Sequence, residues 1–325
     1  MYAGKLGAVI WLASTCIFAA EKSALERGEY GPSDKYPDSA LYDRPTKITS
    51  RVYSAIGATQ PPTSANAGHN NNLSFVIGKE SVLVVNGGAN NALAKALHEE
   101  IKKYTDLPVK FVISENGQGH AFLGNHYWKA QGAKLIGHID AQSEIHNHGF
   151  EILDRMRSYA EHNAQDTDVV DFDEVFVERY ELDLGGNRVV AKSFGEAHSP
   201  GDISILIPSQ KVVLAGDIAF HTRMPPIFDV TDTKLWIESF DEFAIEIKDW
   251  IIVPGHGGPT DIETVKAGTR DYLVYLREKV AALLEKDGTL QDAYEIDQTP
   301  FKSWHTFEEL AARNAGRVFA RMEFE

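Results

Sequence analysis

The sequence predicts an α+β protein: one domain built from two similar halves, each with strands and helices. Three observations support this. Two strand-rich stretches are separated by a long helical stretch at about residues 141–163. In both stretches, apolar runs are joined by short turns, which is typical of β-hairpins and disfavours a purely parallel, doubly wound sheet. The chain contains no internal repeat, low-complexity tract or long linker that would divide it.

The first half opens with a predicted hairpin. Residues 73–78 and 81–86 are β-rich apolar runs joined by a tight turn at Lys79-Glu80. The glycine-rich stretch NGGANN and the helical pattern ALAKALHEEIKKY follow. The next two expected strands are residues 109–113 and 133–138.

The second half follows the expected helix at 141–163 and contains two more hairpins. One covers 178–194 with its turn at Gly185-Gly186, and the other covers 202–217. The remaining expected elements are a helix at 234–247, a strand at 250–255, a long helix at 260–285, and a C-terminal segment at 307–325 with a helix, a break and a further short piece.

The composition restricts the class of partner. The 325 residues include 32 Lys+Arg and 47 Asp+Glu, which gives a formal charge of -15. Such an acidic chain repels nucleic-acid phosphates and anionic lipid headgroups, so we expect neither as a partner. The expected partner is a small-molecule substrate, and the composition leaves the oligomeric state open.

The N-terminus predicts export. One basic residue, Lys5, precedes an apolar run that ends at Ala20, which is typical of a signal peptide over residues 1–20. An uncleaved anchor is the alternative, and a lipoprotein cleavage site at Cys16 fits the preceding residues poorly. We expect a polar, proline-rich arm at 21–65 and the main domain at 66–325, in a periplasmic or secreted protein without membrane insertion of the mature chain.

Cleavage would remove Cys16, the single cysteine of the chain. Any metal in the mature protein must then be held by histidine, carboxylate or amide groups. Three loops after predicted strands offer such groups beside glycine. They are EAHSPGD (196–202), LAGD (214–217) and VPGHGGP (253–259).

These loops contain His198, Asp217 and His256. Imidazole and carboxylate ligands suit Zn²⁺, Fe²⁺ or Mn²⁺, and three ligands with an open position are typical of a catalytic metal. Taken singly, a histidine in such a loop is more often an ordinary loop or core residue than a metal ligand. A fourth loop, NGQGHAFLGN (116–125), lies between a predicted strand and a predicted helix and contains His120.

In order and spacing, these motifs resemble the metallo-β-lactamase superfamily, and more narrowly its secreted branch similar to the sulfur-oxidation and quinoprotein-relay metallohydrolases. The resemblance covers roughly residues 66–259 and is carried by NNLSFVIGKESVLVVNGG, FVISENGQGHAFLGN, FGEAHSPGDISILIPSQKVVLAGD and VPGHGGP. It implies an αββα four-layer sandwich in which each half supplies a sheet and its outer helices. The site would lie at one edge, where the strand-end loops meet.

The resemblance also implies roles for three residues. The third ligand histidine of the family falls on His198, its bridging aspartate on Asp217, and its last histidine on His256. The aspartate of the family's Asp-x-Gly turn is an amide here, Asn86.

The family's His-x-His-x-Asp-His signature is altered in this chain. Its positions fall on Asn116, Gln118, His120 and Ala121 when Gly124-Asn125 is used as the anchor. Amide oxygens are weak neutral ligands, so the first of two metal sites is expected to be lost. The second site would hold one ion on His120, Asp217 and His256, with His198 as a fourth ligand or a wall of the pocket.

The predicted function is metal-dependent hydrolysis of an ester, thioester, lactone or amide in the periplasm. One ion, expected to be Zn²⁺ with iron or manganese as alternatives, would activate water, with His120 and Asp217 as the catalytic residues. His120 could instead act as a general base or only bond its loop. Asn116, Gln118 and His221 are the expected substrate-binding residues.

Two other functions stay open. A degenerate family member could bind a ligand or partner without turnover, because the first metal site is lost. An iron-dependent redox role is compatible with a His/Asp shell but has no specific support. A serine hydrolase is disfavoured because the chain has no Gly-x-Ser-x-Gly motif.

Overall fold

The computed structural model describes Met1 and residues 39–325. Apart from Met1, the predicted signal peptide (1–20) lies outside the described residues, as does the first part of the predicted arm. In the part of the chain that the structure describes, no helix is both long enough and apolar enough to cross a membrane.

Two mixed sheets form the centre of the molecule. The first has seven strands in sequence order: β1 (Thr46–Lys47), β2 (Val52–Ala55), β3 (Leu73–Ile77), β4 (Val82–Val85), β5 (Val109–Ile113), β6 (Lys134–His138) and β7 (Glu174–Phe176). Strands β1 to β4 pair antiparallel, and β4 to β7 pair parallel. The predicted hairpin of β3 and β4 is confirmed, and the region predicted as an arm contributes β1 and β2.

The second sheet has five strands in the order β12-β11-β10-β9-β8. They are β8 (Arg179–Asp183), β9 (Arg188–Lys192), β10 (Ser204–Ile207), β11 (Val212–Phe220) and β12 (Ile251–His256). The two predicted hairpins, β8–β9 and β10–β11, are both present, and β12 adds in parallel to β11.

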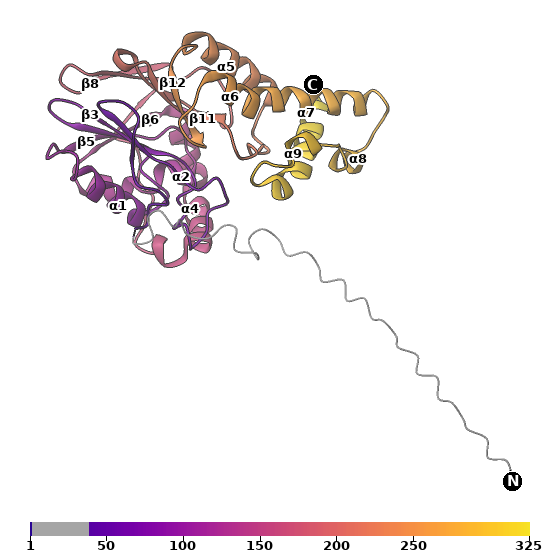
Figure 1. The fold of residues 1–325 in the computed structure, drawn as a ribbon, viewed down its shortest axis with the longest axis horizontal. Coiled ribbons are helices and arrows are strands. Elements are labelled where there is room, and N and C mark those ends of the chain that lie inside the picture. Colours follow the sequence, from indigo (N-terminus) through magenta and orange to yellow (C-terminus); the bar gives the residue numbers. More distant parts are fainter. Residues whose placement is uncertain (2–38) are drawn as a thin grey trace.

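Helices cover the outer face of each sheet (Figure 1). Those of the first half are α1 (Asn91–Ile101), α2 (Gly119–Phe122), α3 (Asn125–Ala130), α4 (Ile139–Ala160) and the 3-10 turn η1 (Glu161–Ala164). Those of the second half are η2 (Pro208–Gln210), α5 (Thr233–Glu246), α6 (Ile262–Val265), η3 (Lys266–Arg270), α7 (Asp271–Leu284), α8 (Leu290–Tyr294), η4 (Thr299–Phe301) and α9 (Phe307–Met322). The last helices, α7 to α9, extend beyond the sandwich in Figure 1.

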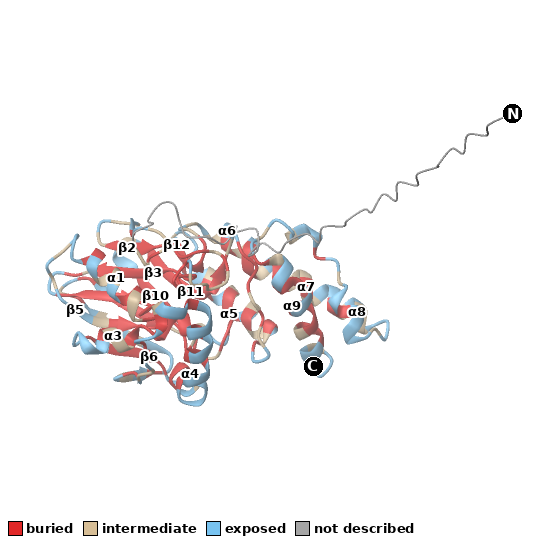
Figure 2. Ribbon diagram, turned by 90° about the horizontal axis from the view of Figure 1, so that it is seen from below, coloured by how far each residue is buried: buried red, intermediate tan, exposed pale blue. Residues whose placement is uncertain are grey.

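Three apolar layers hold these four structural layers together. One lies between the first sheet and its helices, one between the second sheet and its helices, and one between the two sheets. Val76 and Leu83 of the first sheet, with Ile205 and Leu214 of the second, belong to the middle layer. Strands β3, β4, β10 and β11 are buried on both faces because each contributes to two layers. Figure 2 shows β3, β10 and β11 in the colour of buried residues. The predicted α+β class and αββα sandwich are confirmed.

The long helix predicted at 260–285 is present at 262–284, but its expected regular α-helical form is wrong. The π-helical turn η3 separates α6 from α7. Within it, the Thr269 hydroxyl accepts a hydrogen bond from the Phe220 backbone N–H (2.8 Å) and donates one to the Phe220 carbonyl (3.1 Å). The distortion therefore lets the helix satisfy the backbone at the end of β11.

The predicted break in the C-terminal segment is also wrong. Residues Phe307–Met322 form a single helix, α9, which includes Gly316. A Cβ atom at Gly316 would lie 2.3 Å from a ring carbon of Tyr294. This glycine therefore permits close packing of α8 on α9 and does not end the helix.

Candidate metal centre

The candidate site lies at one edge of the two sheets. His120 is in the short helix α2, which follows β5, and His198 is in the loop between β9 and β10. Asp217 is within β11, and His256 is the last residue of the neighbouring strand β12. The fold thus brings together all four residues that the sequence predicts as metal ligands.

Asp217 is at the centre of this group, and its side chain is fully buried. Its Oδ2 lies 3.2 Å from His120 Nε2 and 3.5 Å from His198 Nδ1, and its Oδ1 lies 3.3 Å from His256 Nε2. One ligand atom each from His120, Asp217 and His256 can be chosen so that all three lie within 4.8 Å of one another. Two imidazoles and a carboxylate at this spacing are a donor set for one divalent cation.

The hydrogen bonds of His256 show which nitrogen faces the centre. Its Nδ1 lies 2.5 Å from the backbone carbonyl oxygen of Asn70, which can only accept, so Nδ1 carries the proton. The neutral ring then presents the Nε2 lone pair toward Asp217 Oδ1. Two acceptors that face each other at 3.3 Å repel, and a cation or a proton between them would relieve this repulsion.

Other buried atoms around the centre also have no hydrogen-bond partner among the described residues. They are His198 Nε2, His120 Nε2, Asp217 Oδ1 and Glu115 Oε1. A buried polar atom without a partner is destabilising by about 1–3 kcal/mol. A metal ion held by His120, Asp217 and His256 would give a partner to two of these atoms, His120 Nε2 and Asp217 Oδ1. The residues present therefore fit such an ion.

Asn116 and Gln118 are placed at the other half of the site. Asn116 Oδ1 accepts a hydrogen bond from the Gln118 backbone N–H (3.0 Å), which turns its Nδ2 toward two carboxylates. This Nδ2 lies 3.1 Å from Asp202 Oδ1 and 3.3 Å from Asp217 Oδ2. Gln118 Nε2 lies 3.0 Å from His198 Nδ1. The two amides therefore hold acceptor groups by N–H donation.

Burial and mutual charge set the protonation states of the group. Burial lowers the pKa of His256 to about 4, with help from Arg223, and it lowers the pKa of His198 to about 4. Burial also opposes charge on His120, but the Asp217 carboxylate outweighs this and raises the His120 pKa to about 10. Burial is likewise overcome at Asp217, where His120 and His256 hold the carboxyl pKa well below its usual range.

Sequence reasoning missed two buried carboxylates. Burial and the charge of Asp217 raise the pKa of Glu115 to about 7 and that of Asp202 to about 8. Glu115 Oε1 lies 3.5 Å from His120 Nε2. The available signals were an acidic residue two positions after the apolar strand β5, and the last residue of the EAHSPGD loop.

Two further residues contact His256 at the candidate centre, and no sequence motif indicated either of them. Arg223 is buried, and its Nη1 lies 3.4 Å from His256 Nδ1. Asn70 acts through its backbone carbonyl, which no sequence motif reports.

His221 lies beside the loop after β12. Its Nε2 is 2.7 Å from the Gly258 carbonyl oxygen, and its Nδ1 is 2.7 Å from the Thr222 hydroxyl. Both ring nitrogens thus bond their own neighbourhood, and a role in substrate binding stays a prediction. His146 and His148, the His-x-His pair of α4, are exposed and lie near Asp171 and Glu151.

Fold and site together define a four-layer αββα protein with a candidate centre for one metal ion. The family model for the metallo-beta-lactamase superfamily matches residues 120–256, a span that begins at His120 and ends at His256. Asn116 and Gln118 lie before it.

Two solved structures are similar to this chain. One is a metallo-beta-lactamase from Pontibacter korlensis, with 18% identity and a TM-score of 0.58, which covers 71% of this chain and 98% of that chain. The other is the DIM-1 metallo-beta-lactamase exposed to ceftazidime, with 14% identity and a TM-score of 0.58, which covers 71% of this chain and 96% of that chain. At these identities the likeness shows the fold alone.

Proposed function

We propose that this protein is a metal-dependent hydrolase of the metallo-β-lactamase superfamily that uses one ion. His120, Asp217 and His256 would hold the ion, and His198 would be a fourth ligand or a wall of the site. The proposed ion is zinc, with iron or manganese as alternatives. The observation that carries the proposal is the convergence of the Nε2 lone pair of His256 and the Asp217 carboxylate on a buried point beside His120.

The hydrogen bonds of the two amides support a single ion. In a two-ion site, the positions of Asn116 and Gln118 would have to supply metal ligands. Here their N–H groups face Asp202, Asp217 and His198. They place partial positive charge beside these acceptors, where a first metal ion would otherwise place it. They therefore satisfy those acceptors without a first ion.

The chemistry follows from the donor set. When bound, an ion at this place polarises a carbonyl group and lowers the pKa of water toward neutrality. The chain's own residues would orient the reacting groups. Asn70 fixes the ring of His256, Gln118 fixes that of His198, and Glu115 lies beside His120.

The proposed substrate is a small ester, thioester, lactone or amide, and the proposed location is the periplasm or the exterior of the cell. The location rests on the N-terminal apolar segment of the sequence. Mass measurement of the protein recovered from expressing cells would test it. A chain that starts after residue 19 or 20 supports export, and an intact Met1 contradicts it.

The first test is the metal content of the purified protein by elemental analysis. We expect about one equivalent of metal in the parent, and none in His120→Ala or His256→Ala. The matched control is His146→Ala/His148→Ala, which removes two exposed histidines and should leave the metal content unchanged. Two equivalents in the parent would contradict the single-ion proposal.

The second test is turnover of chromogenic esters, thioesters, lactones and amides by the metal-loaded parent and the same variants. Hydrolysis of one class that is lost with the metal supports the proposal. The alternative function is a binding module without turnover, which the replacement of ligands by Asn116 and Gln118 favours. A metal-free parent that folds normally and hydrolyses none of these substrates would establish the alternative.

A further inference from the structure

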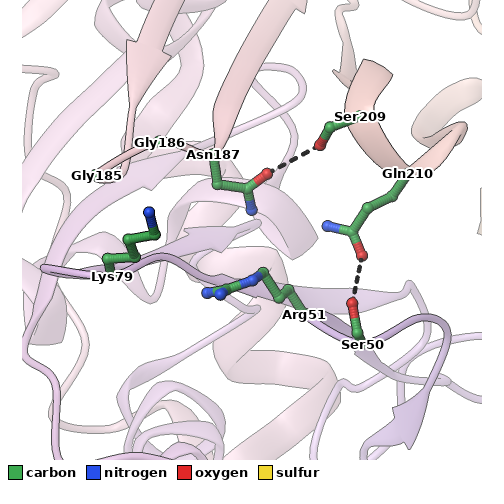
Figure 3. Close-up of a pocket in the computed structure, with 8 residues that line it drawn as sticks. All are labelled: Ser50, Arg51, Lys79, Gly185, Gly186, Asn187, Ser209 and Gln210. Atoms are coloured by element: carbon green, nitrogen blue, oxygen red, sulfur yellow. Dashed lines mark hydrogen bonds between the residues drawn. The ribbon is translucent and has the colours of Figure 1, made fainter.

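A second polar pocket lies at the ends of the strands far from the metal centre (Figure 3). It has a volume of about 150 Å³. Its walls come from both sheets: the segment before β2, the β3–β4 turn, the β8–β9 turn and η2. The lining residues are Ser50, Arg51, Lys79, Gly185, Gly186, Asn187, Ser209 and Gln210.

The pocket is separate from the proposed active site. Gln210 precedes β11, and Asp217 lies within that strand, 217 − 210 = 7 positions later. At about 3.3 Å per residue, an extended strand separates them by roughly 20 Å. A ligand in this pocket therefore would not contact the metal centre.

The groups that face the pocket are hydrogen-bond donors. The Asn187 side chain is buried, with 5% of the residue exposed, and its Nδ2 has no partner among the described residues. Gln210 Nε2 is likewise buried without a partner. Figure 3 shows both amide nitrogens directed into the space that Arg51 and Lys79 border.

Neighbouring hydroxyls hold the two amides in place. Asn187 Oδ1 accepts a hydrogen bond from the Ser209 hydroxyl at 3.2 Å. Gln210 Oε1 accepts hydrogen bonds from the hydroxyls of Ser50, at 3.3 Å, and of Thr49. With their oxygens engaged in this way, the amide nitrogens are left for a ligand.

Two cations complete the pocket. Arg51 Nη1 donates to the carbonyl oxygens of Gly78 (3.1 Å) and Ile77 (3.4 Å), which fixes the guanidinium against the β3–β4 turn. Neither Arg51 nor Lys79 lies within 4.0 Å of a carboxylate of the described residues. Two acidic residues lie beside the glycines of the pocket: Glu80, whose Cγ packs near Gly185, and Asp183, whose Oδ1 accepts from the Gly186 N–H.

We propose that this pocket binds a small oxyanion of the phosphate or sulfate type. Two amide donors and two cations without a carboxylate partner form a site for negative charge, in a chain whose overall charge of -15 repels anions elsewhere. A tetrahedral oxyanion has four oxygen atoms, one for each of the four segments that form the walls. A carboxylate has only two oxygen atoms. The bound anion would connect the ends of the two sheets.

The test is calorimetric titration of the full protein with inorganic phosphate, sulfate, acetate and phenyl phosphate at constant ionic strength. We expect saturable binding of one phosphate or sulfate and none of acetate. Binding of phenyl phosphate as well would show that the pocket accepts the phosphoryl group of a larger molecule, and its failure to bind would show a site for the free ion. No saturable binding of phosphate or sulfate would overturn the proposal.

The most informative variant is Asn187→Asp. It keeps an acceptor for Ser209 and places a carboxylate where the anion would lie, so phosphate affinity should fall by at least about tenfold. Lys79→Ala removes an exposed cation without disturbing the core and should also weaken binding. Lys95→Ala, which removes an exposed lysine from α1, is the charge-matched control and should bind like the parent.

Phosphate and sulfate also stabilise folded proteins without binding to them. The unfolding temperature of each protein should therefore be followed along the same titration. A saturable rise in the parent that is absent in Asn187→Asp supports the site. An equal rise in both proteins would mean a general salt effect and would contradict it.

Discussion

At the scale of single residues, the candidate centre differs from a two-ion site through exchanges of donor chemistry. Asn116 and Gln118 supply N–H groups, and both amides bond acceptors of the site. Glu115 brings a buried carboxylate to within 3.5 Å of His120. Gly216 makes room for Glu115, because a Cβ there would lie 2.0 Å from its Oε2.

This arrangement predicts a specific role for Glu115. The variant Glu115→Gln keeps the shape of the side chain but removes a negative charge beside His120. We expect the affinity for the metal to fall by about 10–100-fold, the usual effect of losing a group that supports a metal ligand. Competition with a chromophoric chelator measures this, and Glu80→Gln, an exposed acid far from the centre, is the control. Unchanged affinity in Glu115→Gln would exclude Glu115 from the centre.

At the scale of elements, the loop between β2 and β3 holds the end of β12 and the residue that follows it. Asn72 Nδ2 donates to the carbonyl oxygens of Pro254 and Gly257, both at 2.7 Å, and the Asn70 carbonyl meets His256. His69 anchors this loop, because its Nδ1 accepts a hydrogen bond from the Tyr42 backbone N–H at 2.7 Å. The local order of the metal centre therefore depends on a segment that carries none of its ligands.

Acidification should test this anchor. Burial lowers the pKa of His69 from 6.5 to about 4. Between these pH values, His69 is therefore protonated in the unfolded chain and neutral in the folded chain. The stability associated with neutral His69 is complete above pH 6.5 and is lost as the pH falls toward 4, by up to about 3 kcal/mol. We expect His69→Gln to be less stable at pH 7 and to lose less stability between pH 6.5 and 4 than the parent.

Urea unfolding at a series of pH values measures this difference in slope. His162→Gln, in η1, removes another histidine and is the control. If the slopes of the parent and His69→Gln were the same, His69 would bind protons equally in the folded and unfolded states, which would contradict a lowered pKa.

At the scale of the whole molecule, the candidate centre joins the two halves of the sandwich. His120 follows a strand of the first sheet, whereas Asp217 and His256 belong to the second. An ion bound by all three would connect the halves at one edge. The predicted oxyanion pocket lies between the same sheets at their other ends.

Removal of the metal should therefore destabilise the folded protein as a unit. An ion that binds only the native state adds about 4 kcal/mol when its free concentration is 1,000 times its Kd. We expect dialysis against a chelator to lower the unfolding temperature of the parent and to leave that of His256→Ala unchanged. Calorimetry with and without the chelator measures both, and an equal response of the two proteins would contradict the assignment of His256.

The elements that could be predicted from the sequence are those with a local cause. The apolar runs of β3, β4 and β5 and the Gly185-Gly186 turn have patterns that no distant contact needs to complete. The π turn could not be predicted, because its Thr269 bonds the backbone of Phe220, which lies 49 residues earlier in the chain. The break predicted in the C-terminal segment was wrong for the same reason, since Gly316 packs against the ring of Tyr294 on another helix.

By itself, the sequence determined which groups are available for chemistry: three histidines and an aspartate in glycine-containing segments after predicted strands, and two amides close to His120. Only the tertiary structure decided how these groups meet. It placed Glu115 and Asp202 in the same buried cluster, set the tautomer of His256 through a backbone carbonyl, and directed the amide nitrogens of Asn116 and Gln118 toward acceptors. The reason is that residue type sets donor and acceptor character, whereas direction and burial arise from contacts between segments far apart in the chain.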